Sequence, residues 1–90
     1  MSRGLGDVYK RQLILPGGIG TADEFFDALN LASLGLITKK IIVYNKNDCW
    51  TDLLTWIDKA KNMEMLRTIP KNLVIAENID EIIFALKSYV

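Results

Sequence analysis

The sequence predicts an α/β fold: a Rossmann-like parallel sheet, truncated to a βαβαβα half, with helices on both faces. Short apolar runs alternate along the chain with segments whose apolar residues recur at helical spacing. A glycine-rich turn, an Asn/Asp-rich loop and a proline separate these segments. Strands that alternate with helices form parallel sheets joined by right-handed crossovers, so the order of the elements predicts the fold class.

The first part of the pattern contains one strand and one helix. Leu13 to Leu15 form a continuous apolar run, as expected of a strand buried on both faces. A helix is predicted over about 22–36, and Gly35 lies where that helix can end. Its apolar stripe has helical spacing and comprises Phe25, Leu29, Ala32 and Leu36, widened by Phe26 and Ala28.

Two further strand–helix units follow. The second strand is predicted at 41–44, rich in β-branched residues, with a turn-forming loop at 45–48. A helix over about 50–62 has one apolar face, formed by Trp50, Leu53, Leu54, Ile57 and Ala60. Pro70 breaks an irregular stretch before the third strand at 73–75. Asn78 and Glu81 form a capping-box arrangement at the last helix. Its predicted apolar face comprises Ile79, Ile82, Ile83, Leu86 and Tyr89.

Three strands are few for a sheet that is buried on both faces. The strand at 13–15 should border further strands on its other side, and these 90 residues supply none. We therefore expect an exposed sheet edge and poor stability of the chain alone.

Residues 1–12 differ from the rest, because they combine isolated glycines and basic residues without helical or strand periodicity. We interpret this segment as translated read-through of a sequencing adapter or, alternatively, as a natural disordered tail. The expected organisation is thus a segment outside the fold at 1–12 and a single domain at 13–90.

Composition excludes several classes of function. Eleven basic and eleven acidic residues give zero net charge, and the scattered basic residues leave no electrostatic footprint for nucleic acid. No apolar run approaches the roughly 20 residues of a membrane span, and no secretory leader is recognisable. The single Cys49 forms no internal disulfide, which suits the cytoplasm. With no histidine present, we expect no metal site.

The turn between the first strand and helix is the most informative motif, because residues 16–24 read PGGIGTADE. Gly17, Gly18 and Gly20 lack a Cβ, so the turn can curl tightly and aim its amides at an anion. Thr21 is expected to begin the helix, whose dipole favours a phosphate at the carboxyl end of the strand. Alternatively, Thr21 and Glu24 form a plain T-x-x-E capping box, in which Glu24 has no catalytic role.

The spelling PGGxGTxxE resembles the signature of the LOG family, the cytokinin riboside 5'-monophosphate phosphoribohydrolases, often mislabelled as lysine decarboxylases. The resemblance covers about residues 13–90, the C-terminal half of such a protein. Further shared residues are Leu34, Gly35, Lys39, Asn45, Leu53, Leu54 and Asp58. Departures from the family pattern are Leu31 for Trp, Ser33 for Gln, Lys40 for Pro, Asp48-Cys49-Trp50 for Gly-Tyr-Tyr, and Glu64-Met65 for Gly-Phe.

The resemblance implies hydrolysis of the N-glycosidic bond of an adenosine 5'-monophosphate, often N6-modified, to free base and ribose 5-phosphate. Glu24 is then the catalytic carboxylate, which stabilises positive charge on the sugar or activates water, with Asp23 as a weaker second candidate. The substrate-binding residues implied are Gly17, Gly18, Ile19, Gly20, Thr21 and Asp23. No metal or organic cofactor is implied.

The resemblance also implies parts that this chain does not match. Family members carry an upstream arginine and an earlier glycine-rich turn, and Arg3 and Arg11 do not fit that pattern. We expect these residues alone to be inactive and an intact parent to be an active homodimer. The alternative is a non-catalytic module that binds a nucleotide or a molybdenum cofactor.

For several other side chains we expect structural and not functional roles. Trp50 is expected in the core, and Trp56, off the apolar stripe, is expected to face a partner chain. Cys49 is expected to be partly buried and unreactive. Lys39 and Lys40 are expected to face solvent.

Overall fold

The computed structural model describes residues 11–87 and contains a parallel sheet of three strands in the order β1-β2-β3. The strands are β1 (Gln12–Ile14), β2 (Ile41–Tyr44) and β3 (Leu73–Ala76). The α-helices are α1 (Ile19–Ser33), α2 (Thr51–Asn62) and α3 (Ile79–Lys87), and a short 3₁₀ turn, η1 (Lys46–Asp48), precedes α2. The α/β class, the parallel sheet and the βαβαβα order are thus confirmed.

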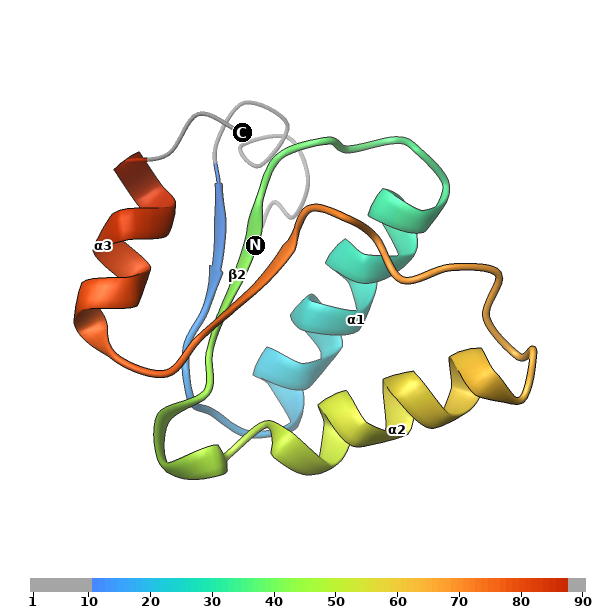
Figure 1. The fold of residues 1–90 in the computed structure, drawn as a ribbon, viewed down its shortest axis with the longest axis horizontal. Coiled ribbons are helices and arrows are strands. Elements are labelled where there is room, and N and C mark those ends of the chain that lie inside the picture. Colours follow the sequence, from blue (N-terminus) through green and yellow to red (C-terminus); the bar gives the residue numbers. More distant parts are fainter. Residues whose placement is uncertain (1–10, 88–90) are drawn as a thin grey trace.

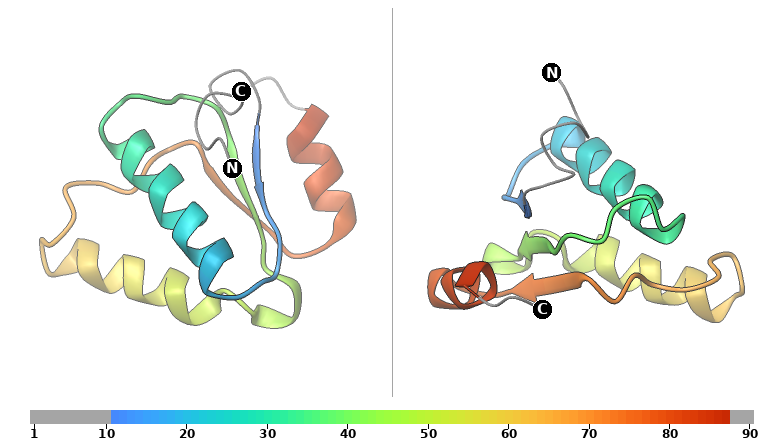
Figure 2. Two further views of the ribbon diagram at one scale, coloured as in Figure 1. Left: turned by 180° about the vertical axis from the view of Figure 1, so that it is seen from behind. Right: turned by 90° about the horizontal axis from the view of Figure 1, so that it is seen from above.

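The helices cover both faces of the sheet (Figures 1 and 2), with α1 and α2 on one side and α3 on the other. Alternation along β2 explains this division, because successive side chains point to opposite faces. Ile41 and Val43 belong to the core cluster beneath α1 and α2, whereas Ile42 belongs to the cluster beneath α3. All three are fully buried, as parallel strands covered on both sides require.

The larger core cluster lies between α1, α2 and one face of the sheet. Phe25 and Trp50 are 0% and 3% exposed, and their ring centroids lie 6.0 Å apart in an edge-on contact. Such an arrangement suits the opposite charges of ring face and ring edge. The prediction that Trp50 belongs to the core is therefore confirmed.

Glycine ends α1 as the sequence indicates. Gly35 has φ +76°, its amide donates to Ala32 O, and the Leu36 amide donates to Leu31 O. These two bonds form a Schellman motif, which satisfies carbonyls at a helix end and favours glycine at the left-handed position. The predicted helix end at Leu36 is three residues too late, and the predicted burial of Leu36 is wrong because it is 65% exposed beyond the helix.

The same motif ends α2 without a glycine. The Glu64 amide donates to Lys61 O and the Met65 amide to Ala60 O, and Glu64 has φ +61°. Asp48 in η1 also has a positive φ, +59°. These are the two positions at which the resemblance places glycine. The chain adopts a left-handed backbone at both, with side chains that favour this conformation less than glycine does.

The last helix departs from its predicted packing. Its buried residues are Ile82 and Ala85, which pack against the face of β2 and β3, whereas Ile79, Ile83 and Leu86 are exposed. Tyr89 lies outside the described residues. Asn78 accepts from the Glu81 amide at 2.9 Å, as predicted, but the Glu81 carboxylate accepts from the Glu77 amide instead of closing the box on Asn78.

Two side chains lie in different surroundings from those predicted. Lys40 is half-buried and its ammonium donates to Ala85 O at 3.1 Å, near the end of α3, where a cation compensates the helix dipole. Its neighbour Lys39 is exposed, as expected. Cys49 is exposed instead of partly buried, because it follows η1 at the outer turn of the chain.

Candidate active site

The N-terminus of α1 lies at the end of β1, at the edge of the sheet where the strands end (Figure 1). The helix begins at Ile19, two residues before the predicted Thr21, and Gly18 is its N-cap. The first helical bond runs from the Ala22 amide to Gly18 O at 3.0 Å. The amides of Ile19, Gly20 and Thr21 precede it and have no acceptor within the helix.

This start excludes the capping-box interpretation. Thr21 lies inside the first turn, and the N-cap of α1 makes no side-chain hydrogen bond. In a T-x-x-E box the threonine itself would be the N-cap. Glu24 therefore belongs to the second turn of the helix and does not serve to cap it.

The steric surroundings of the three glycines of the turn differ. A Cβ on Gly17 would collide with the Thr21 hydroxyl and lie 2.9 Å from Thr21 Cβ. At Gly18 and Gly20 a Cβ would meet no atom within 4 Å. Gly35 is the only glycine among residues 11–87 with a positive φ. The backbone of the turn thus requires glycine at Gly17, whereas a Cβ at Gly18 or Gly20 would point into open space.

Glu24 projects from the flank of α1 that faces away from α2. Phe26 contacts Trp56 of α2, with ring centroids 6.1 Å apart and ring planes at 90°. Glu24 precedes Phe26 by two residues, or about 200° around a helix, so it lies on the opposite flank. Thr21 lies on the Glu24 side, because residues three apart are neighbours on a helix.

The surroundings of the two acidic candidates differ. Glu24 is half-buried, and residues 11–87 give its carboxylate no hydrogen bond or ion pair. Asp23 is exposed and one position off the Thr21–Glu24 flank. The geometry brings Glu24, Thr21 and the free amides of α1 onto one end and one flank of the helix, while Asp23 lies beside them.

Asn45 organises the neighbouring strand end, and the sequence indicated it only as a residue shared with the family. It is 4% exposed, accepts from the Trp50 amide at 2.7 Å and donates to the Thr51 hydroxyl at 3.0 Å. Its backbone amide donates to Ala76 O at 2.8 Å. Asn45 therefore joins the ends of β2 and β3 through its backbone, and its buried side chain holds the start of α2.

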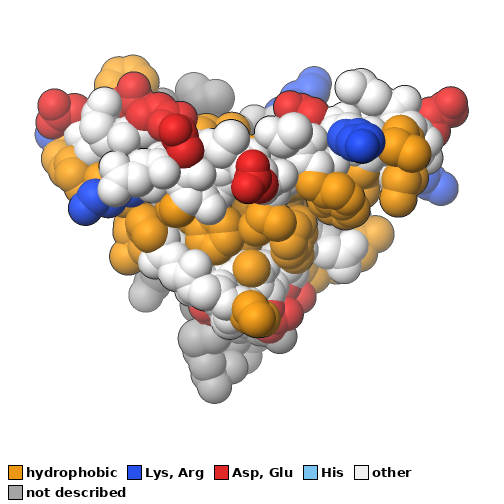
Figure 3. Space-filling view, turned by 90° about the horizontal axis from the view of Figure 1, so that it is seen from below, with side chains coloured by type: hydrophobic (Ala, Val, Ile, Leu, Met, Phe, Trp, Pro, Cys, Tyr) orange, Lys and Arg blue, Asp and Glu red, His pale blue; other side chains and the backbone are white. Residues whose placement is uncertain are grey.

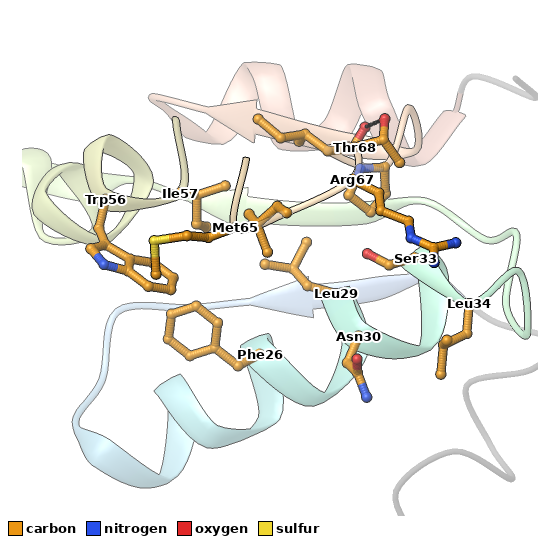
Figure 4. Close-up of a pocket in the computed structure, with 13 residues that line it drawn as sticks. Phe26, Leu29, Asn30, Ser33, Leu34, Trp56, Ile57, Met65, Arg67 and Thr68 are labelled. Atoms are coloured by element: carbon orange, nitrogen blue, oxygen red, sulfur yellow. Dashed lines mark hydrogen bonds between the residues drawn. The ribbon is translucent and has the colours of Figure 1, made fainter. Parts of the chain in front are cut away.

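An apolar groove of about 520 Å³ lies on the other flank of α1 (Figure 4). Phe26 and Leu29 of α1 form one wall, Trp56 of α2 forms the other, and Met65 lies between them. Trp56 and Met65 remain 47% and 62% exposed. The exposure of Trp56 agrees with its position off the apolar stripe.

Residues 11–87 contain no cluster of three or more His, Cys, Asp or Glu side chains that could hold a metal ion. None of their helices is both long enough and apolar enough to span a membrane.

Comparisons with known proteins agree with the motif. The chain is 33% identical over 85 residues to a cytokinin riboside 5'-monophosphate phosphoribohydrolase of Rhodococcoides fascians, covering 93% of this chain and 41% of the relative. An Arabidopsis thaliana enzyme named for the same activity is 31% identical over 78 residues, covering 86% of this chain and 36% of the relative. Another, from Mycobacterium marinum, is 31% identical over 70 residues, covering 77% of this chain and 37% of the relative. The chain thus spans about two fifths of the length of these relatives.

A sequence model of the family described as "possible lysine decarboxylase" matches residues 8–86. The match includes the whole glycine turn, all three strands and nearly all of α3. It also reaches into residues 8–12, the last part of the segment predicted to lie outside the fold, and Gln12 begins β1. Because the model matches most of its length, the chain belongs to this family, the LOG family of phosphoribohydrolases.

Proposed function

We propose that this protein, when its domain is complete, hydrolyses the N-glycosidic bond of an adenosine 5'-monophosphate-type nucleotide. The products are the free base and ribose 5-phosphate. The observation that carries the proposal is the free N-terminus of α1, with open glycines at Gly18 and Gly20, joined on one flank to Glu24. The activity for which the relatives are named supports the same reaction.

The 5'-phosphate is assigned to the start of α1. The amides of Ile19, Gly20 and Thr21 supply donors, and the positive end of the helix dipole favours a dianion there. Gly17 and Gly18 form the turn that leads into these donors, and the absence of a Cβ at Gly18 and Gly20 keeps the approach open. Phosphate binding then holds the ribose in place, so remote binding energy positions the reacting bond.

Glu24 is assigned to the chemistry. It lies three residues, or about 4.5 Å along the helix axis, beyond Thr21, which suits a ribose attached to a phosphate at the helix start. Cleavage of the glycosidic bond develops positive charge on the sugar, and a carboxylate can stabilise that charge or take a proton from the attacking water. Asp23 is assigned a secondary, substrate-binding role.

The partner and location of the protein are also proposals. We assign the apolar groove beside Phe26 and Trp56 to a homodimer of the complete protein, supported by the exposure of Trp56 and Met65. A cytoplasmic location is supported by the lone, exposed Cys49. No cofactor enters the proposed reaction.

Base release measured by chromatography tests the proposal. The enzyme is a chimera in which this chain is fused to the part of the Rhodococcoides fascians relative that lies outside the matched region. AMP and N6-isopentenyl AMP are the substrates. Glu24→Gln should lower kcat at least about 100-fold with KM little changed, since general acid–base groups contribute roughly 10²–10⁴-fold. Asp23→Asn is the matched control and should lose less than about tenfold.

Two results would oppose the proposal. Full activity of the Glu24→Gln chimera would remove Glu24 from the chemistry. Nucleotide binding without any base release by the unsubstituted chimera would favour the alternative, a non-catalytic nucleotide-binding module.

A further inference from the structure

The loops that follow β1 and β2 leave the sheet from adjacent strand ends. Ile14 and Val43 are the last register partners of the two strands. The helices that follow, α1 and α2, cover the same face of the sheet, so both loops turn toward that face (Figure 1). Gly17 in the first loop and Lys46 in the second are each three residues beyond the last pair. Since neighbouring strands lie only about 4.7–4.9 Å apart, Lys46 belongs to the loop next to the glycine turn.

The segments that follow the three strands carry mainly acidic side chains. They comprise residues 15–25, 45–55 and 77–83, which run from each strand end into the second turn of the next helix. Figure 3 looks onto this edge of the sheet and shows acidic side chains above and below a band of hydrophobic ones. Lys46 is the only Lys or Arg residue in these segments. Their acidic residues are Asp23, Glu24, Asp48, Asp52, Glu77, Asp80 and Glu81.

Lys46 has a fixed backbone and an uncommitted side chain. Its carbonyl accepts from the Cys49 amide at 3.1 Å, and the preceding residue, Asn45, accepts from the Trp50 amide at 2.7 Å through its buried side chain. The Lys46 side chain is exposed, and residues 11–87 give its ammonium no hydrogen bond or ion pair. A rigid loop thus carries a cation that no contact within the described chain uses.

We propose that Lys46 binds the 5'-phosphate of the nucleotide together with the amides at the start of α1. The inference deepens the proposed function and rests on it, because it concerns the phosphate assigned to that helix start. The amides supply fixed dipoles, whereas lysine adds a point charge on a flexible stem, which is how lysine recognises phosphate. A dianion at this edge is repelled by the carboxylates around it, and one local cation offsets that repulsion. Lys46 therefore favours phosphorylated substrates over free nucleosides.

Binding of ribose 5-phosphate to the same chimera, measured by calorimetry, tests the role of Lys46. This ligand has the sugar and the phosphate but no base, so its binding requires no chemistry. Lys46→Gln should raise its Kd about tenfold, since loss of a hydrogen bond to a charged group weakens binding roughly tenfold or more. Lys46→Arg keeps the charge and should stay within about threefold. Lys71→Gln is the matched control, because Lys71 is exposed just before β3 at the opposite edge of the sheet.

Three further measurements separate phosphate binding from a structural role. With AMP as substrate, Lys46→Gln should raise KM about tenfold and leave kcat within about twofold, the pattern of lost binding that substrate and transition state share. The Kd for ribose 5-phosphate should rise less steeply with salt concentration than in the unsubstituted chimera, because one screened charge contact is gone. The melting temperature should not change, because the Lys46 side chain is exposed.

The outcomes separate this inference from the proposed function. Equal Kd values of the unsubstituted and Lys46→Gln chimeras for ribose 5-phosphate would overturn the role of Lys46. An equal loss of affinity in Lys71→Gln would do the same, because only net charge would then matter. Binding of ribose 5-phosphate that depends on Lys46, without base release from AMP, would uphold this inference and contradict the proposed hydrolysis. Base release with a KM that Lys46→Gln leaves unchanged would do the reverse.

Discussion

At the scale of single residues, Gly17 is the position in the glycine turn with the least space. Gly17→Ala would drive a Cβ into Thr21, and the turn must shift to relieve the collision. Overpacking of this kind costs about 1–3 kcal/mol. We expect a lower midpoint of urea unfolding followed by circular dichroism, and weaker phosphate binding because Thr21 moves.

Gly20→Ala is the matched control for Gly17→Ala. Its Cβ meets open space and replaces a helical glycine, which stabilises a helix by roughly 0.5–1 kcal/mol. The unfolding midpoint should rise, while AMP affinity of the chimera should fall because the added methyl occupies the approach to the amides. Equal unfolding midpoints for both variants would contradict the steric account of the turn.

Asn45 is the second residue whose role is specific. Asn45→Ala leaves the buried Trp50 amide without its acceptor, and an unsatisfied buried group costs about 1–3 kcal/mol. The melting temperature should fall clearly, as measured by circular dichroism. Asn45→Asp keeps an oxygen for the Trp50 amide and should lose less. The exposed Asn62→Ala is a control and should change little; a fall as large as that of Asn45→Ala would refute the argument.

At the scale of elements, α2 ends in a turn that its sequence disfavours. Glu64 has φ +61° in a Schellman motif in which glycine is the usual residue. Glu64→Gly should therefore stabilise the chain by about 1 kcal/mol, which corresponds to roughly 4–8 °C in melting temperature for a domain of this size. Glu64→Ala keeps the left-handed strain and should give no such gain. Similar melting temperatures for the two variants would contradict the strain argument.

The elements also show what the sequence could predict. β2 is predicted to the residue, because a buried β-branched run between polar residues has one interpretation. The start of α1 is less predictable. Thr21 has the residue type of an N-cap, but the helix begins at Ile19, and the absence of a Cβ at Gly17 leaves room for the Thr21 side chain in the first turn. The burial of α3 depends on which strands it crosses, and that is a tertiary property that helical periodicity does not contain.

The sequence likewise predicts one part of the candidate site and not another. The glycine turn and Glu24 follow from a motif that is local in sequence. Their relation to the rest of the domain does not, because the flank on which Glu24 lies is defined by the contact between Phe26 and Trp56, residues 30 positions apart. The linking role of Asn45 between two strand ends and α2 is likewise visible only in three dimensions.

At the scale of the whole molecule, the chain has a folded core on one side and an open sheet edge on the other. Phe25 is fully buried in the core cluster beneath α1 and α2, whereas the side chains of Leu13 in β1 and Leu15 just after it are exposed. Glu24 lies on the flank of α1 that is turned away from α2.

The central claim is that the start of α1 binds the nucleotide phosphate while Glu24 acts on the glycosidic bond. Its most direct test is the affinity of the Glu24→Gln chimera for AMP, measured by calorimetry beside its rate of base release. The account predicts a Kd within about threefold of that of the unsubstituted chimera, together with a loss of turnover of at least about 100-fold. A loss of binding that matches the loss of turnover would contradict it, because Glu24 would then hold the substrate without acting on the bond.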